Sequence, residues 1–586
     1  VTGSCTIIKF LDRTILFEFG GIQEGHTILS NYQMNKEQIS KVHAKDVDMI
    51  IGGHFMHYDH GGNIPALVKK NSNIRIITGK NTSGILKEMW LDSANISIRD
   101  CETLSNQYSD KTFVPIYDVS DVERAYSLIE EYDIGTIHKL DENISIRYTY
   151  SGHIFGATQC EVFISIKNHT TKLLFTSDLG NQKIQDLKPF VQKFEPVVNA
   201  QYVFGECTYG ARDNKQITQK IINKDLEKIK SVIKQFCGEY HRRVLMPVFS
   251  LDKCPVVLWI IYNMFKDDKD FDTKVLIDSP LTNRLLDRYS EVLEGEAKKS
   301  FDEMLSWKNL KRIISPEDSK YAMENMTNIL ILSSGGMLQS GRSVKWAKEL
   351  LPHGNDCLIL SGYCGENTLG YKIKNCSDQK TITINGTVVK NKAQIINVRS
   401  LSGHCQRDDL LKYYSSIHSE KICLIHGQME GKTEFAQDLR KEIANKSMTT
   451  TVCVVNKNTE IQAEIKVKPV IKRKNETTVD ESIIRRENVI IYLLINGNEI
   501  NRKKIKENIQ LEDFKYSLNK EILQKIYEAI DNSKSVTNIV DSMEEKELIS
   551  QCTKIMADDY EISDIDKCIE DIINSYTKDK LIRKTK

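Results

Sequence analysis

Three histidines and an aspartate crowd one short stretch of the chain, directly after an apolar run. His54, His57, Asp59 and His60 follow residues 47–51, whose composition predicts a buried strand. Imidazole and carboxylate are the ligands that hold zinc while leaving a position open for water. A histidine-rich surface loop that binds nothing is the alternative. The ligand density at a strand end, together with matching residues further along, favours a site for two adjacent metal ions.

Three further residues of the same kinds recur at the ends of predicted strands. His153 stands in a loop of small residues, Asp178 follows the run 174–177 and precedes a glycine at 180, and His426 ends the run 422–425. Taken singly, each has a structural explanation as a hydrogen-bonding histidine or a turn-forming carboxylate. Because loops at strand ends converge on one edge of a sheet, together they predict one shared site.

The elements that must position these residues change character along the chain. Residues 1–208 alternate short β-rich runs with turn residues, and such runs return at 396–465. Residues 209–395 alternate helical periods with apolar strands, which indicates a parallel sheet. One domain interrupted by an inserted one explains this order. Residues 466–480 have the composition of a polar linker, and residues 481–586 have apolar residues at helical spacing.

Length and composition narrow the class of protein. A chain of 586 residues is too long for one core and suggests two or three domains. The formal net charge of +1 provides no global field for nucleic acid, so any polyanion site must be local. The 14 cysteines lack paired C-x-x-C spacing, which favours reduced thiols in a cytoplasmic protein. No apolar run reaches the roughly 20 residues that a membrane span needs.

The order of these motifs resembles the β-CASP branch of the metallo-β-lactamase fold over about residues 1–465. Residues 54–60 resemble its His-x-His-x-Asp-His motif, and 152–153 and 177–178 resemble its later His and Asp motifs. Glu206 resembles the acidic motif that opens the inserted domain, and His404 and His426 resemble the two closing His motifs. Core segments of the inserted domain are similar to residues 277–281, 333–337, 341–342, 362–363 and 368–370.

The resemblance implies an α/β protein with a defined domain order. Residues 1–208 and 396–465 would form an αββα metallo-β-lactamase sandwich, 209–395 an inserted α/β β-CASP domain, 466–480 a linker and 481–586 a helical C-terminal domain. The implied relatives are RNA-processing nucleases, such as the cleavage and polyadenylation endonuclease and its prokaryotic relatives. A β-lactamase or thioesterase is disfavoured, since those enzymes lack the inserted domain and the Glu206/His404 pair.

The resemblance also implies two Zn²⁺ ions per chain and a role for each ligand. One ion would be held by His54, His57 and His153, a second by Asp59, His60 and His426, with Asp178 between them. Two cations about 3.5–4 Å apart lower the pKa of a shared water and clamp an in-line displacement at phosphorus. The leaving oxygen then needs a proton from outside the metal shell. His404, oriented by Glu206, is the implied catalytic acid, and Asp59 is counted with the catalytic residues. The alternative for His404 is a loop histidine with satisfied hydrogen bonds.

Two departures from the family pattern affect this interpretation. Phe55 and Met56 separate His54 from His57, whereas the family has one residue between its first two histidines. Either the chain bulges so that His54 still reaches the metal, or one ligand is lost and the first site is weakened or empty. The second, milder departure is Glu18, where the family usually has aspartate.

Substrate and partners are predicted from fewer residues. A small polar loop, Ser333, Ser334, Gly335 and Gly336, offers backbone N–H groups for a phosphate, and Arg342 offers a guanidinium. A tight turn and a solvated arginine are the alternatives. In the family, histidine at the last motif marks branches acting on RNA, so His426 indicates single-stranded RNA. A DNA nuclease of the same fold, or a metal-impaired RNA-binding scaffold, stays open.

The tail resembles, faintly, the helicase-binding helical domain at the end of bacterial primase, through residues 485–494, 511–514 and 522–530. That likeness implies a helicase, replication or RNA-processing factor as a protein partner through 481–586. A generic protein-binding or dimerising module is the alternative, and a homodimer is left open. No membrane partner is expected.

Overall fold

The computed structural model describes residues 2–25, 27–167, 169–212, 217–362, 364–365, 368–376, 380–457, 459–462, 480–532, 534–536, 539–543, 545–557, 560, 562 and 564–584. The predicted linker, except for Asp480, lies outside the described residues, and so does Tyr363 of the segment 362–363.

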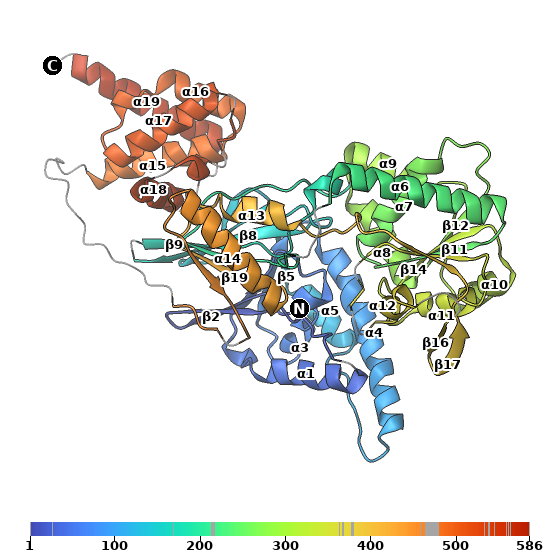
Figure 1. Ribbon diagram of the computed structural model, residues 1–586. Coiled ribbons are helices and arrows are strands. Elements are labelled where there is room, and N and C mark those ends of the chain that lie inside the picture. Colours follow the sequence, from blue (N-terminus) through green and yellow to red (C-terminus); the bar gives the residue numbers. More distant parts are fainter. Residues whose placement is uncertain are drawn as a thin grey trace.

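Two mixed sheets packed face to face form the centre of the molecule (Figure 1). The first has the order β1-β2-β3-β4-β5: β1 (Thr6–Phe10), β2 (Arg13–Phe17), β3 (Met49–Ile51), β4 (Arg75–Gly79), β5 (Ile129–Tyr132). The second has the order β20-β19-β10-β9-β8-β7-β6: β6 (Ile137–Lys139), β7 (Ile144–Tyr150), β8 (Thr158–Ile166), β9 (His169–Phe175), β10 (Tyr202–Gly205), β19 (Lys421–Leu424), β20 (Thr451–Val454). Alternate side chains of both sheets fill the space between them. Phe17, Phe175 and Phe204 stack across it, with ring centroids 3.9 and 4.6 Å apart.

Helices cover the outer face of each sheet. The other face of β2, β3 and β4 packs on α1 (Ile28–Ser40), α3 (Ile64–Val68), α4 (Ser83–Gln107) and α5 (Val119–Ser127). The outer face of β9, β10 and β19 packs on α13 (Arg407–Tyr414) and α14 (Met429–Asn445). The architecture is therefore an αββα sandwich, which confirms the predicted fold class.

Between β10 and α13 the chain forms a second α/β unit around a parallel sheet, with the order β13-β12-β14-β11-β15-β18. Its strands are β11 (Arg243–Val248), β12 (Lys274–Asp278), β13 (Leu310–Ile313), β14 (Ile329–Ser334), β15 (Cys357–Leu360) and β18 (Gln394–Asn397), and β16 (Thr381–Ile384) and β17 (Thr387–Lys390) form a separate hairpin. Its helices are α6 (Gln219–Ile233), continued by a π-helical turn (Lys234–Glu239), α7 (Lys253–Phe265), α8 (Pro280–Val292), α9 (Gly295–Leu305), α10 (Pro316–Asn325), α11 (Arg342–Leu350) and α12 (Leu369–Lys374). The predicted boundary at 395/396 cuts through β18, which pairs with β15, so the inserted sheet extends to Asn397.

The inserted unit is joined to the sandwich by a shared core and by buried charge. Side chains of α4 and of the loops around 155 and 190 pack with those of α7, α8 and α9 in one apolar cluster. In that interface the buried Glu88 of α4 accepts hydrogen bonds from Arg284 at 2.7 Å and Arg288 at 3.3 Å, both on α8. Because a buried carboxylate is costly without a partner, these two guanidiniums favour the observed packing of α8 on α4.

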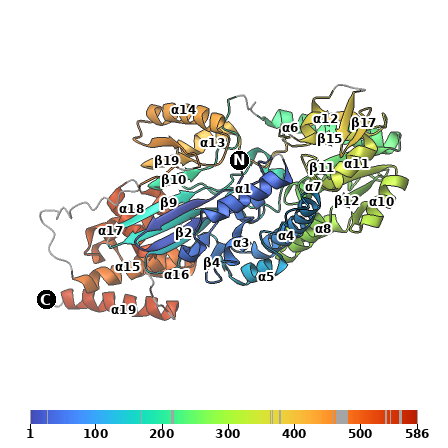
Figure 2. The same ribbon diagram turned by 90° about the horizontal axis from the view of Figure 1, so that it is seen from below.

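The C-terminal helices form a separate cluster at the end of the sandwich opposite the inserted unit (Figures 1 and 2). They are α15 (Glu481–Asn496), α16 (Glu499–Asn508), α17 (Ser517–Asp531), α18 (Lys546–Ala557) and α19 (Ile565–Lys584), with 3-10 turns at Leu511–Asp513 and Ile539–Ser542. They bury their own core, and α18 contacts β6 and β9. Beneath them the buried Glu161 pairs with Arg147 and Lys172, and Asn199 donates a hydrogen bond to the Val540 carbonyl at 3.0 Å. Among the described helices, none is long and apolar enough to cross a membrane.

Candidate metal centre

The predicted ligands lie in loops at the ends of sandwich strands. His54 follows β3, His153 follows β7, Asp178 follows β9, and His426 follows β19. The remaining three belong to a short helix, α2 (Tyr58–Gly61), with His57 as its N-cap and Asp59 and His60 inside it. Strand ends of two facing sheets thus deliver side chains that are up to 372 positions apart in sequence (His54 to His426) to one place.

The first group consists of His54, His57, His153 and Asp178, whose ligand atoms all lie within 4.8 Å of one another. The Asp178 Oδ2 atom is 4.0 Å from His54 Nε2 and 3.7 Å from His153 Nε2. The ring centroids of His54 and His57 are 4.4 Å apart. Three imidazoles and a carboxylate at these separations match the donor set of a zinc site.

The extra residue between His54 and His57 is absorbed by a turn. Phe55 and Met56 form that turn, and their side chains are 2% and 1% exposed in the apolar core. The Phe55 ring lies against Gly52, where an added Cβ would be 2.1 Å from Cε1. Turning two apolar side chains inward leaves His54 facing the other ligands, so the geometry agrees with the bulge and not with loss of a ligand.

The second group consists of Asp59, His60 and His426. The Oδ2 atom of Asp59 is 3.9 Å from His60 Nε2 and 4.0 Å from His426 Nε2. Asp178 reaches this group as well, because its Oδ1 is 3.9 Å from His426 Nε2 and its Oδ2 is 3.4 Å from His60 Nε2. Asp178 therefore stands between the two groups, in the position predicted for a bridging carboxylate.

His426 is held in place by the backbone that follows it. Gly427 has a φ of 133°, which favours glycine, and a Cβ there would lie 2.3 Å from the Cys207 carbonyl oxygen. The Cys207 N–H in turn donates to the His426 carbonyl. The loops after β10 and β19 are thus locked together directly at the site.

Glu18 is a site residue whose role the sequence did not reveal. It is 2% exposed, and its Oε2 accepts hydrogen bonds at 2.7 Å from His60 Nδ1 and from the Ser4 hydroxyl. Its Oε1 accepts a bond from the Ser177 hydroxyl at 2.8 Å. A carboxylate on Nδ1 fixes the tautomer of a ligating histidine and leaves Nε2 for the metal. The only signal was the departure from the family's aspartate at this position.

His404 and Glu206 lie beside the first group, and their loops are tied to the loop of Asp178. The Asn181 and Cys405 N–H groups donate to the Gly403 and Leu179 carbonyls at 2.8 Å each. The Glu206 carboxylate accepts bonds from the Leu179 N–H at 3.0 Å and from the Thr208 N–H at 2.9 Å. Its Oε1 is 3.8 Å from His404 Nδ1, which is an electrostatic contact rather than a hydrogen bond.

Burial and charge set the protonation of the centre. Burial and neighbouring imidazoles hold the pKa values of His54 and His153 well below the usual range, so both are neutral and able to bind a cation. For His60, burial lowers the pKa, but the carboxylates of Glu18, Asp178 and Asp59 raise it well above the usual range. For His404, burial is likewise outweighed by Glu206, Asp178 and Asp59, and its pKa is about 8.

The donor atoms themselves provide a test of whether a cation fits. Among the described side chains, buried polar atoms without a hydrogen-bond partner gather at this centre: His54 Nδ1 and Nε2, His60 Nε2, His153 Nε2, Asp178 Oδ1 and His404 Nδ1. Unsatisfied buried atoms of this kind are costly and call for a ligand. The neutral imidazoles of His54 and His153 and the Asp178 carboxylate, whose pKa is held well below its usual range, are in the forms that bind Zn²⁺. The residues fit a cation-binding centre.

The predicted phosphate-binding loop lies at the carboxyl end of β14. Two of the predicted phosphate ligands bind partners inside the protein instead. Arg342 pairs with the buried Asp278 and donates to the Ile314 carbonyl at 2.7 Å. The Ser333 hydroxyl is buried and donates to the Asp278 carbonyl at 3.1 Å. These internal partners contradict the use of Arg342 and the Ser333 side chain as phosphate ligands. Half-buried positions remain at Ser334, Gly335 and Gly336.

An αββα sandwich that gathers imidazoles and carboxylates at its strand ends defines the metallo-β-lactamase class of folds. Two family profiles match within the chain: "Beta-Casp domain" over residues 256–373 and "Zn-dependent metallo-hydrolase RNA specificity domain" over residues 388–449. Over these two segments the chain carries domains of the β-CASP type, as its motifs indicated.

Curated relatives extend the similarity to between 68% and 77% of the chain. The chain is 24% identical to "Transcription termination factor FttA" of Methanocaldococcus jannaschii, over 68% of this chain and 61% of the relative. It is 25% identical to an "RNase J-like protein" of the same organism, over 72% of this chain and 91% of the relative. It is 23% identical to "Endoribonuclease ysh1" of Schizosaccharomyces pombe, over 77% of this chain and 55% of the relative. The chain thus spans only part of FttA and of ysh1.

Proposed function

We propose that this protein is a zinc-dependent ribonuclease that hydrolyses phosphodiester bonds of single-stranded RNA. The observation that carries the proposal is the placement of Asp178 between two ligand groups, with the His404/Glu206 pair beside the first. Such an arrangement fits two cations and a separate proton donor, which are the parts that phosphodiester hydrolysis requires.

Zinc, at two ions per chain, is the metal proposed. His54, His57 and His153 would hold one ion and Asp59, His60 and His426 the other, with Asp178 shared. A combination of imidazole and carboxylate ligands is typical of zinc sites in proteins. The family description "Zn-dependent metallo-hydrolase" supports the same metal. When bound, the ions would supply an activated water and neutralise charge on the phosphate oxygens.

The protein's own residues account for the proton that the leaving ribose oxygen needs. Glu206 faces Nδ1 of His404, so the proton of Nε2 is the one available to substrate. The His404 side chain is 26% exposed, compared with 24% for Asp59 and 10% for His426, so solvent and substrate can reach it. Cations bound to Asp178 and Asp59 would cancel the charges of those two carboxylates. Glu206 would then be the carboxylate that continues to favour the protonated form of His404.

RNA rather than DNA is proposed on two grounds. The description of the second matching profile includes the words RNA specificity domain. Two of the relatives carry the names RNase J-like protein and endoribonuclease. Histidine rather than valine at position 426 agrees with the RNA-acting branches that the chain resembles.

Matched RNA and DNA oligonucleotides of one sequence, incubated with zinc-loaded protein, test the proposal. RNA should be cleaved at least about tenfold faster than DNA, and metal analysis should find two zinc ions per chain. Faster DNA turnover would identify a DNA nuclease instead. Absence of both zinc and cleavage, with RNA binding retained, would identify a scaffold.

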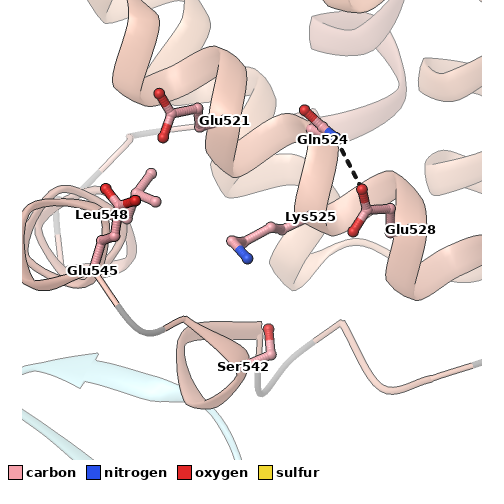
Figure 3. A pocket seen from close by; sticks show the side chains of 7 residues that line it. All are labelled: Glu521, Gln524, Lys525, Glu528, Ser542, Glu545 and Leu548. Atoms are coloured by element: carbon pink, nitrogen blue, oxygen red, sulfur yellow. Dashed lines mark hydrogen bonds between the residues drawn. The ribbon is translucent and has the colours of Figure 1, made fainter.

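For residues 481–586 we propose binding of a protein partner, a helicase or an RNA-processing factor. Ile500 is 77% exposed on this cluster and Ile565 is 44% exposed. Figure 3 shows a pocket in the same helical cluster, lined by Glu521, Gln524, Lys525, Glu528, Ser542, Glu545 and Leu548. Light scattering of the full chain, alone and with candidate partners, separates hetero-association from a homodimer.

A further inference from the structure

Two adjacent residues of the inserted unit, Asp252 and Lys253, lie at the start of α7 in a strained turn. Asp252 has φ 57° and ψ −57°, and the Lys253 N–H donates to the Leu251 carbonyl at 2.6 Å. This is a γ-turn with positive φ at its centre, a rare and strained conformation. Strain of this kind persists where the surrounding structure requires it, often at functional sites.

The side chains of this turn lie against the loop that carries His404. The Lys253 ammonium donates a hydrogen bond to the Leu401 carbonyl. A Cβ placed on Gly403 would be 3.9 Å from Asp252 Oδ2 and 3.4 Å from the Cε1 atom of His153. Gly403 therefore lies within van der Waals reach of both His153 and Asp252, so the turn of Asp252 and the loop of His404 are in close contact.

A buried lysine holds the loop that carries His153. Lys188 has no exposed surface, and its ammonium donates to the Gly152 carbonyl at 2.8 Å and to the His153 carbonyl at 2.9 Å. The Gly403 carbonyl accepts a bond from His153 Nδ1 at 3.3 Å, so the two loops are joined.

Asp252 is the counter-charge of both lysines. Its carboxylate attracts the ammonium groups of Lys188 and Lys253, and each of these groups holds a backbone carbonyl of one loop. Burial raises the pKa of Asp252 to about 6, and burial lowers the pKa of Lys253 to about 8. Both groups therefore carry charge at neutral pH. Asp252 Oδ1 is buried without a hydrogen-bond partner, so the local field of the two lysines is what stabilises it.

We propose that Asp252 and Lys253 are positioning residues through which the inserted unit sets the loops of His404 and His153. The inference rests on the proposed function for its consequence, but the contacts belong to the fold itself. Neither residue supplies a proton or a ligand. Docking of the inserted unit brings α7 against residues 401–403, and the general acid takes its place as a result.

Hydrogen–deuterium exchange of the metal-free full chain tests the structural half. Lys253→Met should raise amide exchange across residues 399–405 by about tenfold, because one hydrogen bond to the loop is lost. Lys253→Arg should restore exchange to within about threefold of the original, since a guanidinium can donate to the same carbonyl. Lys266→Met, on the exposed far end of α7, is the matched control. Unchanged exchange in a folded Lys253→Met protein would overturn the proposal.

Steady-state kinetics with zinc-loaded protein and RNA test the functional half. Lys253→Met should lower kcat by about tenfold or more while KM and zinc content stay within about threefold, because misplacement of the acid affects chemistry and not binding. Loss of zinc in proportion to kcat would contradict a positioning role.

A second variant protects the test from misfolding. Asp252→Gly adopts the observed backbone without strain and removes only the carboxylate, so it should fold and still show faster loop exchange and lower kcat. Wild-type behaviour of this variant would also overturn the proposal. If the unaltered protein cleaves no RNA, the proposed function fails, and loop exchange alone decides the positioning role.

Discussion

Shortening Glu18 by one methylene is expected to weaken zinc binding at His60. The Glu18→Asp carboxylate would retreat by about 1.5 Å, one C–C bond, so the 2.7 Å contact with His60 Nδ1 would stretch to about 4 Å. A hydrogen bond from a charged group contributes about 1.5–3 kcal/mol, and loss of such an outer partner typically lowers metal affinity about 10–100-fold. A loss of about 2 kcal/mol corresponds to about thirtyfold in the dissociation constant.

Chelator competition with the metal-free protein measures this change directly. Glu18→Gln serves as the intermediate case, because its amide oxygen can still accept from His60 while the charge is gone. Its affinity should fall less than that of Glu18→Asp. Glu37→Gln, which changes an exposed carboxylate paired with Lys41, is the matched control and should leave zinc binding unchanged. Zinc affinity of Glu18→Asp within about twofold of the original would refute the reasoning, since a partner that fixes the imidazole cannot be lost without effect.

Other outcomes follow from the same centre. His404→Ala should abolish cleavage while zinc and RNA affinity stay within about twofold; loss of zinc in a metal assay would instead make this imidazole a ligand. Because the acid must keep its proton, kcat should fall as pH rises, and the limb should lie below the His404 pKa of about 8 in the metal-free protein, since bound cations cancel the charges of Asp178 and Asp59. Glu206→Gln should move this limb of the pH–rate profile to lower pH. A limb that does not move would show that Glu206 does not raise the pKa of His404. Phe55→Ala should lower the unfolding free energy of the metal-free protein by about 3–5 kcal/mol in urea titration; a loss below about 1 kcal/mol would show that the turn before His57 is not packed.

The sequence was most informative where chemistry is local. Three of the seven proposed ligands stand within four residues of one another, His57 to His60, and the rest each follow a predicted strand, so their types and positions predicted a common site. The inserted parallel sheet followed from the alternation of strand and helix patterns, whereas the αββα class followed from the resemblance of the motifs to the metallo-β-lactamase fold.

Contacts between distant segments were beyond such reasoning. The role of Glu18 depends on His60, 42 residues away, and no periodicity relates them. Arg342 was expected to bind phosphate, but its guanidinium pairs instead with Asp278, which lies 64 residues earlier in the inserted sheet. The inward turn of Phe55 and Met56 likewise depends on which glycines face them, which only the folded chain shows.

The interrupted sandwich has a consequence for biosynthesis. Strand β10 pairs in register with β19, Tyr202 against Lys421, although the whole inserted unit separates them in the chain. Such non-local pairing forms slowly, and during translation the earlier strand must wait until its partner leaves the ribosome. His404 and His426 emerge among the last parts of the centre, so a nascent chain has no complete set of metal-site residues until residue 426 has left the ribosome.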